Sequence, residues 1–245
     1  MYRFFVDPSQ IGEKEIRITG SDVNHIKNVL RMKEKEEVII SDGQKMEYTC
    51  YLKELNPDEI VASIMFADEV GLELPSKVYL FQGLPKSDKM ELIIQKAVEL
   101  GAYEIIPVST KRTIVKLDAK KEAAKLKRWQ GISESAAKQS KRMVIPQVTK
   151  VMSFKEALEY ARDMDVKLIP YELAKDMAET KGIIEQIKPG QSIGIFIGPE
   201  GGFEESEVSQ ALEMDFHPIT LGKRILRTET AGFTVLSILM YQLEQ

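Results

Sequence analysis

Two short segments of the sequence hold the residue types best suited to binding a ligand and acting on it. The first is 198–203, GPEGGF, which directly follows the apolar run IGIFI. Its three glycines within five residues let the backbone approach a ligand closely and offer it N–H and C=O groups. The second is 221–231, LGKRILRTETA, in which Arg224, Arg227 and Glu229 stand near apolar residues. We expect main-chain binding from the first segment and charged side chains from the second.

Each segment also has a purely structural explanation. Glycines permit tight turns whether or not a ligand is bound. In the second segment, Thr228 or Thr230 is a suitable N-cap for a following helix, with the arginines in solvent. Both segments follow predicted strands, however, and open α/β sheets bind ligands at the carboxyl ends of their strands. Their position therefore favours a ligand site.

The motifs of several large enzyme classes are missing from the sequence. There is no GxxxxGK[ST] loop and no GxGxxG after a strand, which argues against ATP hydrolysis and NAD chemistry. His25 and His217 are far apart, and Cys50 is the single cysteine, so no cluster has metal-ligand spacing. The same scarcity argues against a Ser-His-Asp or Cys-His nucleophile. We expect no metal and a structural role for each histidine.

The residues up to 70 predict mainly short strands and one helix. Alternating or β-branched apolar residues predict strands over 15–19, 37–41, 46–55 and 60–66. Apolar residues recur at helical spacing over 23–31, and Ser21 and Asp22 are candidate N-caps. Gly71 and Pro75 interrupt the pattern, and we place the domain boundary after residue 72. This composition indicates a small β-barrel over 1–72.

From residue 77 onward, strands and helices alternate. The predicted strands are 78–82, 104–109, 144–148, 166–171, 192–197 and 218–221. The predicted helices are 87–100, 119–141, 154–162, 174–187, 205–214 and 228–243. Nearly continuous apolar strands between helices indicate a parallel sheet covered on both faces, so we expect an α/β domain over 73–245.

The composition is that of an ordinary globular protein. Of the 245 residues, 43% are hydrophobic and 29% charged, and no apolar run approaches 18 residues. Asp7 and Pro8 interrupt the N-terminus before a signal-peptide core could form, and one cysteine allows no internal disulfide. We therefore expect a soluble, cytoplasmic protein without a membrane segment.

A net charge of −4 conceals a strongly basic segment. Residues 111–150 hold 12 Lys or Arg and three acids, a local net charge of +9, so the remaining residues carry −13. A solvated helix face explains such a run, but this asymmetry favours RNA phosphates as its partner. The candidate RNA-binding residues are Lys121, Lys125, Arg128, Lys138, Lys141 and Arg142 here, and Arg3, Lys27, Arg31 and Lys33 in the N-terminal barrel.

Several segments in the same order resemble one family. IGPEGGF, LGKRILRTETA and ESAAKQSKRMVIP, with YRFFVD and DVNHIKNVLRMK near the N-terminus, resemble the ribosomal RNA small subunit methyltransferase E family, in the SPOUT class of methyltransferases. The resemblance spans almost the whole chain. It implies a PUA-like barrel over 1–72 and a parallel-sheet SPOUT methyltransferase domain over 73–245 with a C-terminal trefoil knot.

The resemblance also implies a cofactor, a substrate and a partner. S-adenosylmethionine (SAM) would donate the methyl group, N3 of a uridine in the 16S rRNA of the small ribosomal subunit would accept it, and the enzyme would be a homodimer. The candidate cofactor-binding residues are Thr110, Gly198, Pro199, Glu200, Gly201, Gly202, Leu221, Gly222, Arg224, Ile225, Leu226, Thr230 and Ala231. One departure from the family pattern is Lys111, where an acid is expected.

The chemistry of that reaction suggests roles for the charged residues. Methyl transfer from a sulfonium to a nitrogen requires alignment of the two atoms and exclusion of water. Neutral uridine carries a proton on N3, so we expect Arg227, supported by Arg224, to stabilise the uridinate. Glu229 either accepts the proton or orients Arg227. The alternatives are another SPOUT methyltransferase acting on tRNA or a ribose 2′-hydroxyl, and a non-catalytic RNA-binding module.

Overall fold

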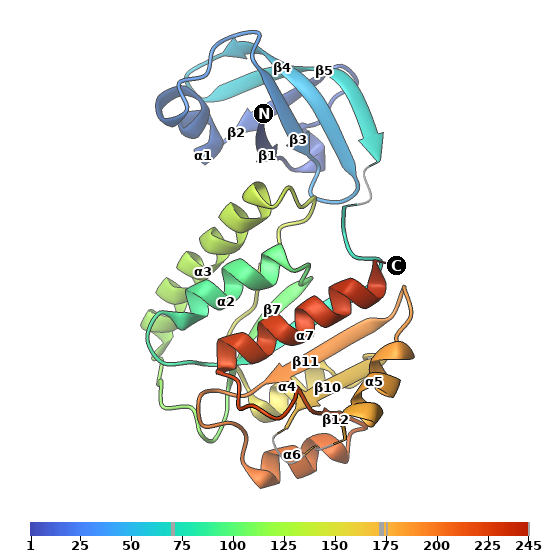
Figure 1. The fold of residues 1–245 in the computed structure, drawn as a ribbon. Helices are drawn as coiled ribbons and strands as arrows, with labels where there is room; N and C mark the ends of the chain where they lie inside the picture. The colour runs from blue at the N-terminus through green and yellow to red at the C-terminus, as the bar shows by residue number, and fades with distance from the viewer. Residues whose placement is uncertain (70–71, 172–173, 175, 245) are drawn as a thin grey trace. The chain divides into compact units, whose positions relative to one another are not determined.

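The computed structural model describes residues 1–69, 72–171, 174 and 176–244. The chain forms two compact units (Figure 1). The first consists of Met1–Glu73 together with Lys141–Ile145, and the second of Leu74–Ser140 and Pro146–Gln245. The predicted boundary uses Gly71, which lies outside the described residues. The return of five later residues to the first unit was not predicted.

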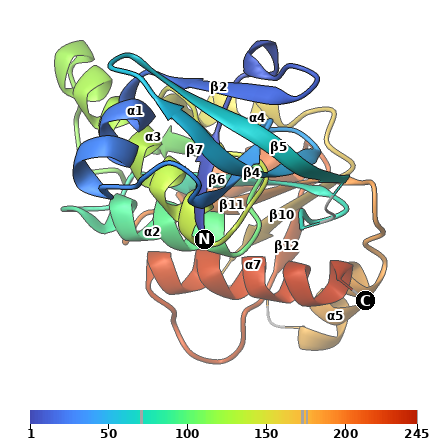
Figure 2. The same ribbon diagram turned by 90° about the horizontal axis from the view of Figure 1, so that it is seen from above.

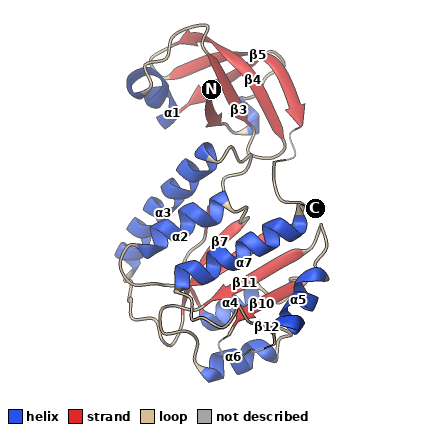
Figure 3. Cartoon of the chain, viewed as in Figure 1, coloured by secondary structure: helices blue, strands red, loops and turns tan. Residues whose placement is uncertain are grey.

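The first unit is built on a curled five-stranded sheet with the order β1-β3-β4-β5-β2 (Figures 1 and 3). Its strands are β1 (Tyr2–Phe5), β2 (Glu15–Thr19), β3 (Glu37–Ser41), β4 (Met46–Leu55) and β5 (Glu59–Glu69). β1 pairs with β3 in parallel, and the other pairs are antiparallel. Ile16 and Ile18 of β2 face a core that also holds Phe4 and Ile40, while Arg17 faces outward. The predicted two-residue alternation is confirmed in β2.

The predicted helix is present between β2 and β3, but its start differs from the prediction, and a short 3₁₀ helix over Pro8–Gln10 also lies between β1 and β2. α1 (Ser21–Asn24) is followed directly by a π-helical turn over His25–Val29. The N-cap is Gly20, so no side chain caps the helix. Its φ is 75°, a backbone conformation that glycine adopts without strain. The His25 ring packs edge-on against Phe4, with ring centroids 6.3 Å apart. This contact supports a structural role for His25.

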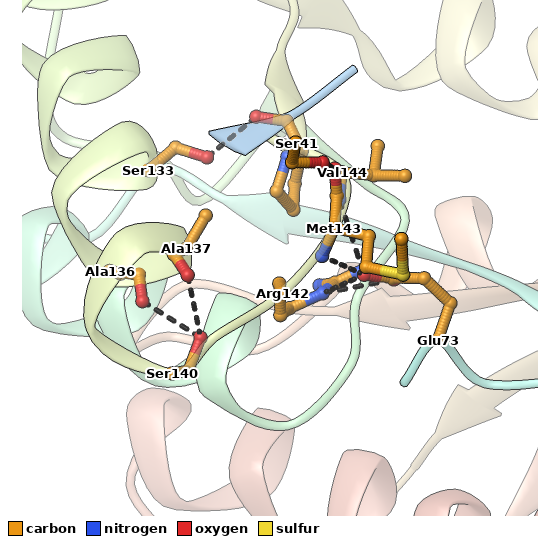
Figure 4. Close-up of polar contacts among 10 residues, drawn as sticks. Ser41, Glu73, Ser133, Ala136, Ala137, Ser140, Arg142, Met143 and Val144 are labelled. Carbon is orange, nitrogen blue, oxygen red and sulfur yellow. Dashed lines mark hydrogen bonds and ion pairs between the residues drawn. The ribbon is translucent and has the colours of Figure 1, made fainter. Parts of the chain in front are cut away.

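The returning segment 141–145 is held by one carboxylate (Figure 4). Glu73 accepts hydrogen bonds from the Nε of Arg142 at 3.0 Å and from the backbone N–H groups of Met143 at 2.9 Å and Val144 at 3.3 Å. In addition, the Ser41 hydroxyl donates to the Met143 carbonyl at 2.9 Å. The predicted strand over 144–148 is therefore reduced to β8 (Gln147–Val148). The N–H of Val144 donates to Glu73, and Pro146 has no backbone N–H, so neither residue can donate a hydrogen bond to a neighbouring strand.

The second unit contains a seven-stranded sheet of parallel pairs. Its order is β12-β10-β11-β6-β7-β8, and β9 also pairs with β7. Besides β8, the strands are β6 (Lys77–Gly83), β7 (Glu104–Ser109), β9 (Met152–Ser153), β10 (Val166–Pro170), β11 (Ser192–Ile197) and β12 (His217–Ile219). The prediction of a parallel sheet is confirmed, and every long strand lies within three residues of its expected bounds.

Helices cover both faces of this sheet (Figures 1 and 2). They are α2 (Lys89–Glu99), α3 (Ala119–Gln139), α4 (Phe154–Tyr160), α5 (Met177–Glu185), α6 (Glu205–Leu212) and α7 (Thr228–Leu243). α2 packs against α3 and α7, and α7 packs on β11. On the opposite face, α4 and α6 enclose a core that includes Phe81 and Phe196, whose rings stack 4.1 Å apart.

Three further sequence predictions concern the helix over 174–187, a membrane segment and the knot. Lys175, within the helix predicted over 174–187, lies outside the described residues. No described helix is long and apolar enough to cross a membrane. The trefoil knot implied by the resemblance stays a prediction.

Candidate functional site

The carboxyl ends of three neighbouring strands enclose a cavity of about 340 Å³. β10 lies between β11 and β12 in the sheet, and the chain leaving each strand lines the cavity. We call 198–203, after β11, the glycine loop, and 220–227, after β12, the arginine loop. The volume lies in the range of small-molecule sites, and main chain provides much of the wall.

Most of the cofactor-binding residues expected from the sequence line this cavity. They are Gly198, Pro199, Glu200, Gly201, Gly202, Leu221, Gly222, Arg224, Ile225, Leu226 and Ala231. Thr110 and Thr230 are not among its lining residues. The Thr110 hydroxyl instead lies 3.0 Å from the hydroxyl of Thr113, and the Thr230 carbonyl accepts a hydrogen bond from Thr234.

Sequence reasoning missed five other residues of the cavity wall, Arg112, Pro170, Tyr171, Ile197 and Thr220. Phe203, Lys223 and Thr228 also line the cavity, and they lie within the two segments that the sequence singled out. Pro170 ends β10 and Tyr171 follows it. The sequence contained a signal for these two residues. The strand predicted over 166–171 ends there, and the carboxyl ends of parallel strands lie at the edge of the sheet where ligands bind.

The glycine loop requires glycine for two separate reasons. A Cβ on Gly198 would lie 3.0 Å from two backbone carbons of Gly202, so the turn has no room for a side chain. Gly202 itself has φ 67°, in the left-handed region, and its N–H donates to the Pro199 carbonyl at 2.8 Å. The loop therefore folds tightly on itself and presents main chain to the cavity.

Glu200 connects the glycine loop to the start of α2 through a hydrogen bond and an ion pair. Its carboxylate accepts a hydrogen bond from the backbone N–H of Lys86 at 3.1 Å and lies 3.3 Å from the Nζ of Lys89. Burial opposes ionisation of this carboxyl, but the N–H groups of Glu200 and Lys86 and the Lys89 ammonium together lower its pKa below 4.5. Glu200 is therefore an anion at the cavity wall at neutral pH.

A turn at 110–113 supports the glycine loop from another side. Arg112 donates from Nε to Glu204 at 2.8 Å and from Nη1 to the Gly201 carbonyl at 2.8 Å. The hydrogen bond and charge of Arg112 lower the pKa of Glu204. Lys111 donates from its backbone to Glu207 at 2.9 Å, and from Nζ to the Ser206 hydroxyl at 2.8 Å. Residue 111 is a lysine where the family pattern has an acid, and the carboxylates that contact this turn are those of Glu204 and Glu207.

The arginine loop is fixed by hydroxyl groups. The Thr220 N–H donates to the Thr180 hydroxyl of α5 at 3.0 Å, and the Gly222 N–H donates to the Thr220 hydroxyl at 3.3 Å. Gly222 has φ 107°, which a residue with a Cβ rarely adopts. Ile225, in contrast, is 93% exposed. The start of this loop is held firmly, while its tip extends into solvent.

The three residues proposed for chemistry occupy different positions. Arg224 and Arg227 are both exposed, and only Arg224 lines the cavity. Arg227 is the N-cap residue of α7. Among the described residues its side chain makes no ion pair. Glu229 lies 3.3 Å from the Nζ of Lys89, so a lysine of α2, and not Arg227, holds it.

The candidate RNA-binding residues of the first unit differ in accessibility. Arg3 is buried and pairs with Glu47 at 2.6 Å, and Arg142 is buried against Glu73. Lys27 is partly buried and donates to the Asn56 carbonyl at 2.9 Å. Arg31, Lys33 and Lys141 are exposed. An arginine already paired in the core is not available to a phosphate, so exposure favours the last three residues.

On α3, all four expected cations already have acidic or aromatic neighbours. Lys121 pairs with Asp118, Arg128 with Glu91 and Lys138 with Glu134, and the Nζ of Lys125 lies 5.7 Å from the Trp129 ring centroid. Lys120 and Lys127, which sequence reasoning did not select, are exposed. Neither makes an ion pair within the described part of the chain.

The described residues contain no group of three or more His, Cys, Asp or Glu side chains that could hold a metal ion. His217 is exposed at the start of β12 and His25 contacts Phe4 in the first unit.

Two family models match the chain. A model of an RNA methyltransferase domain matches residues 72–240, and a model of an RNA methyltransferase PUA domain matches residues 18–65. The ribosomal RNA small subunit methyltransferase E of Bacillus subtilis is 40% identical over 250 residues, covering 100% of this chain and 98% of the relative. That of Mesomycoplasma hyopneumoniae is 39% identical, covering 97% and 98%.

Solved structures agree with this assignment. The ribosomal RNA small subunit methyltransferase E from Neisseria gonorrhoeae, bound to SAM, has a TM-score of 0.83 and 35% identity, covering 97% of this chain and 96% of its own. A methyltransferase from Legionella pneumophila, in complex with the bound cofactor SAM, has a TM-score of 0.86 and 30% identity, covering 98% and 97%. The resemblance seen in the sequence motifs is confirmed: the chain belongs to the ribosomal RNA small subunit methyltransferase E family.

Proposed function

We propose that this protein transfers the methyl group of SAM to N3 of a uridine in 16S rRNA. The observation that carries the proposal is the cavity between the glycine loop and the arginine loop, in a chain that belongs to this family. Relatives solved with SAM support the cofactor, and the printed names of the relatives support small-subunit rRNA as the acceptor. The choice of N3 rests on the family resemblance.

The residues around the cavity fit SAM. A side chain on Gly198 would collide with the backbone of Gly202, so glycine at this position keeps the loop that lines the cavity tightly folded. The loop main chain supplies donors and acceptors of the kind that recognise an adenosine, and the Glu200 carboxylate provides negative charge toward a cationic ligand. When bound, SAM supplies an electrophilic methyl group. The chain's part is to orient the reactants and exclude water.

Arg227 and Arg224 are proposed to stabilise the uridine after N3 loses its proton. The negative charge of a uridinate spreads onto its two carbonyl oxygens, and guanidinium donors match such planar acceptors. Both arginines are exposed beside the cavity, where an incoming base would be presented. Glu229 is the proposed proton acceptor, held in place by Lys89.

The exposed cations are proposed to bind the RNA backbone. Lys120 and Lys127 on α3 extend the predicted basic surface, and Arg31 and Lys33 supply cations in the first unit. We further propose a homodimer, supported by Ile238 and Tyr241 of α7, which are 38% and 74% exposed. An rRNA substrate supports a cytoplasmic location.

Two assays test the proposed function. Calorimetric titration should show binding of SAM to the isolated protein, and labelled SAM should transfer its methyl group to 16S rRNA in small subunits but not to tRNA. Labelled tRNA would instead support a related methyltransferase. Binding of RNA without binding of SAM would support a non-catalytic RNA-binding module.

A further inference from the structure

A chain of buried hydrogen bonds lies beneath the two loops of the cavity. Gln82, near the end of β6, is completely buried and donates from Nε2 to the hydroxyl of Thr228 at 2.9 Å. The Thr228 hydroxyl donates in turn to the Gly198 carbonyl at 2.6 Å. Thr228 begins α7 directly after the arginine loop, and Gly198 begins the glycine loop. One hydroxyl therefore connects the two loops.

The chemistry of these groups fixes the direction of every bond. The Gly198 carbonyl only accepts, so the single proton of the Thr228 hydroxyl is committed to it. Thr228 then accepts from its other neighbour, which requires the NH₂ end of the Gln82 amide. The second proton of that NH₂ goes to the Gly83 carbonyl at 2.9 Å, which also only accepts. A carboxylate or an apolar side chain at 82 would break the pattern.

This arrangement leaves one buried polar atom of Gln82 without a partner. Its Oε1 accepts no hydrogen bond within the part of the chain that the structure describes. The position that a Cβ on Gly232 would occupy is 3.7 Å from this oxygen, so α7 passes close to it at a residue without a side chain. An unpaired buried acceptor is unfavourable for stability. Buried polar atoms without a hydrogen-bond partner are expected mainly at functional sites.

The glycine loop also rests directly on the end of β6. A Cβ on Gly83 would lie 2.6 Å from both the N and the Cδ of Pro199 and 3.0 Å from the carbonyl carbon of Gly198. The loop therefore has no freedom to move toward the sheet. The bond from Thr228 restrains the rotation of the peptide that carries the Gly198 carbonyl.

We propose that Thr228 and Gln82 are positioning residues that set the SAM affinity of the cavity by holding the glycine loop in register with the arginine loop. Thr228 fixes the Gly198 peptide, and Gln82 fixes the direction of the Thr228 hydroxyl. A preorganised loop binds more tightly because less ordering remains to be done on binding. This inference rests on the proposed use of SAM, and it separates cofactor affinity from the methyl-transfer step assigned to Arg227 and Glu229.

The test compares SAM affinity, turnover at saturating SAM and thermal unfolding across a set of variants. Thr228→Val keeps the shape but removes the hydroxyl, and we expect it to weaken SAM binding about tenfold or more. Thr228→Ser keeps the hydroxyl and should bind within about threefold of the wild type. Gln82→Met removes the donor from a side chain of similar length and should also weaken binding. Turnover at saturating SAM should change much less than affinity in all three.

The control is Thr234→Val on the same helix, because the Thr234 hydroxyl donates to the Thr230 carbonyl and Thr234 is not among the residues that line the cavity. It should leave SAM affinity unchanged. Wild-type affinity in folded Thr228→Val protein would overturn the inference. If that variant does not unfold cooperatively, Gln82→Met decides in the same way, because it removes the donor that sets the direction of the Thr228 hydroxyl. Failure of the wild type itself to bind SAM would overturn the proposed function and this inference with it.

Discussion

Arg142 is buried beside Glu73, and the Nε of the arginine lies 3.0 Å from a carboxylate oxygen of the glutamate. The same carboxylate accepts the N–H of Met143, 70 residues later in the sequence than Glu73. These bonds bring the segment 141–145 back to the first unit (Figure 4). A basic residue expected on an RNA-binding surface is therefore part of the first unit's internal structure.

Replacing Glu73 should destabilise the protein. In Glu73→Gln the Arg142 guanidinium loses its negative partner while it stays buried, and we expect a loss of about 1–3 kcal/mol in the free energy of unfolding. Urea denaturation measures this loss. The matched control is Glu59→Gln, because Glu59 pairs with the well-exposed Arg17 and should contribute less than about 1 kcal/mol. Equal effects in the two variants would contradict a structural role for Glu73.

Arg227→Ala should slow methyl transfer without weakening the binding of SAM. Arg227 does not line the cavity, so SAM affinity should remain within about threefold of the wild type. Loss of a donor to the developing anion should lower the rate about 100-fold or more. Single-turnover kinetics with saturating SAM measures the rate. Arg162→Ala, whose arginine pairs with Glu159 outside the cavity, serves as the control. An unchanged rate in Arg227→Ala would remove Arg227 from the proposed chemistry.

The contribution of Glu200 to stability should disappear in acid. The pKa of this carboxyl in the folded protein lies below 4.5, so folding favours its ionised form. That contribution is fully present above about pH 4.5 and is lost as the pH falls through the folded-state pKa. Wild-type protein should therefore exceed Glu200→Gln in stability at pH 7, and the difference should shrink below pH 4.5. Urea titrations of both proteins at several pH values provide the measurement. A difference that grows on acidification would show that the sign is wrong.

Lys120 and Lys127 should account for part of the salt dependence of RNA binding. Each phosphate contact contributes about 0.7–0.9 to the slope of log affinity against log salt. Joint replacement of both lysines by glutamine should reduce the steepness of this slope by about 1–2. Lys155→Gln on α4, also an exposed lysine, should leave the slope unchanged. An unaltered slope in the double variant would place the RNA elsewhere.

Periodicity predicted the parallel sheet because a strand buried on both faces must be apolar over most of its length. It failed where one distant side chain determines the local structure. The mainly apolar segment 144–148 favours a strand, yet Val144 donates its N–H to Glu73. No local pattern reveals a partner so far away in the sequence. The same reason explains Arg142, whose charge is visible in the sequence but whose burial is not.

At the site, the sequence indicated the loops but not what holds them. Glycine spacing pointed to the glycine loop because close backbone packing leaves few alternatives to glycine. Thr228 was considered only as a helix cap, whereas its hydroxyl donates to the Gly198 carbonyl on another loop. Gln82 follows the apolar run 78–81 of its strand and was not singled out at all. Such contacts depend on the register between strands, which composition and spacing do not fix.

The most direct test of the proposed function is to identify the methylated atom. Unmodified small ribosomal subunits, or 16S rRNA, are incubated with labelled SAM and the protein, and the RNA is digested to nucleosides for mass spectrometry. The proposal predicts that the label is recovered as 3-methyluridine and that Arg227→Ala strongly reduces it. Label on a ribose or on a different base, with none in 3-methyluridine, would contradict it.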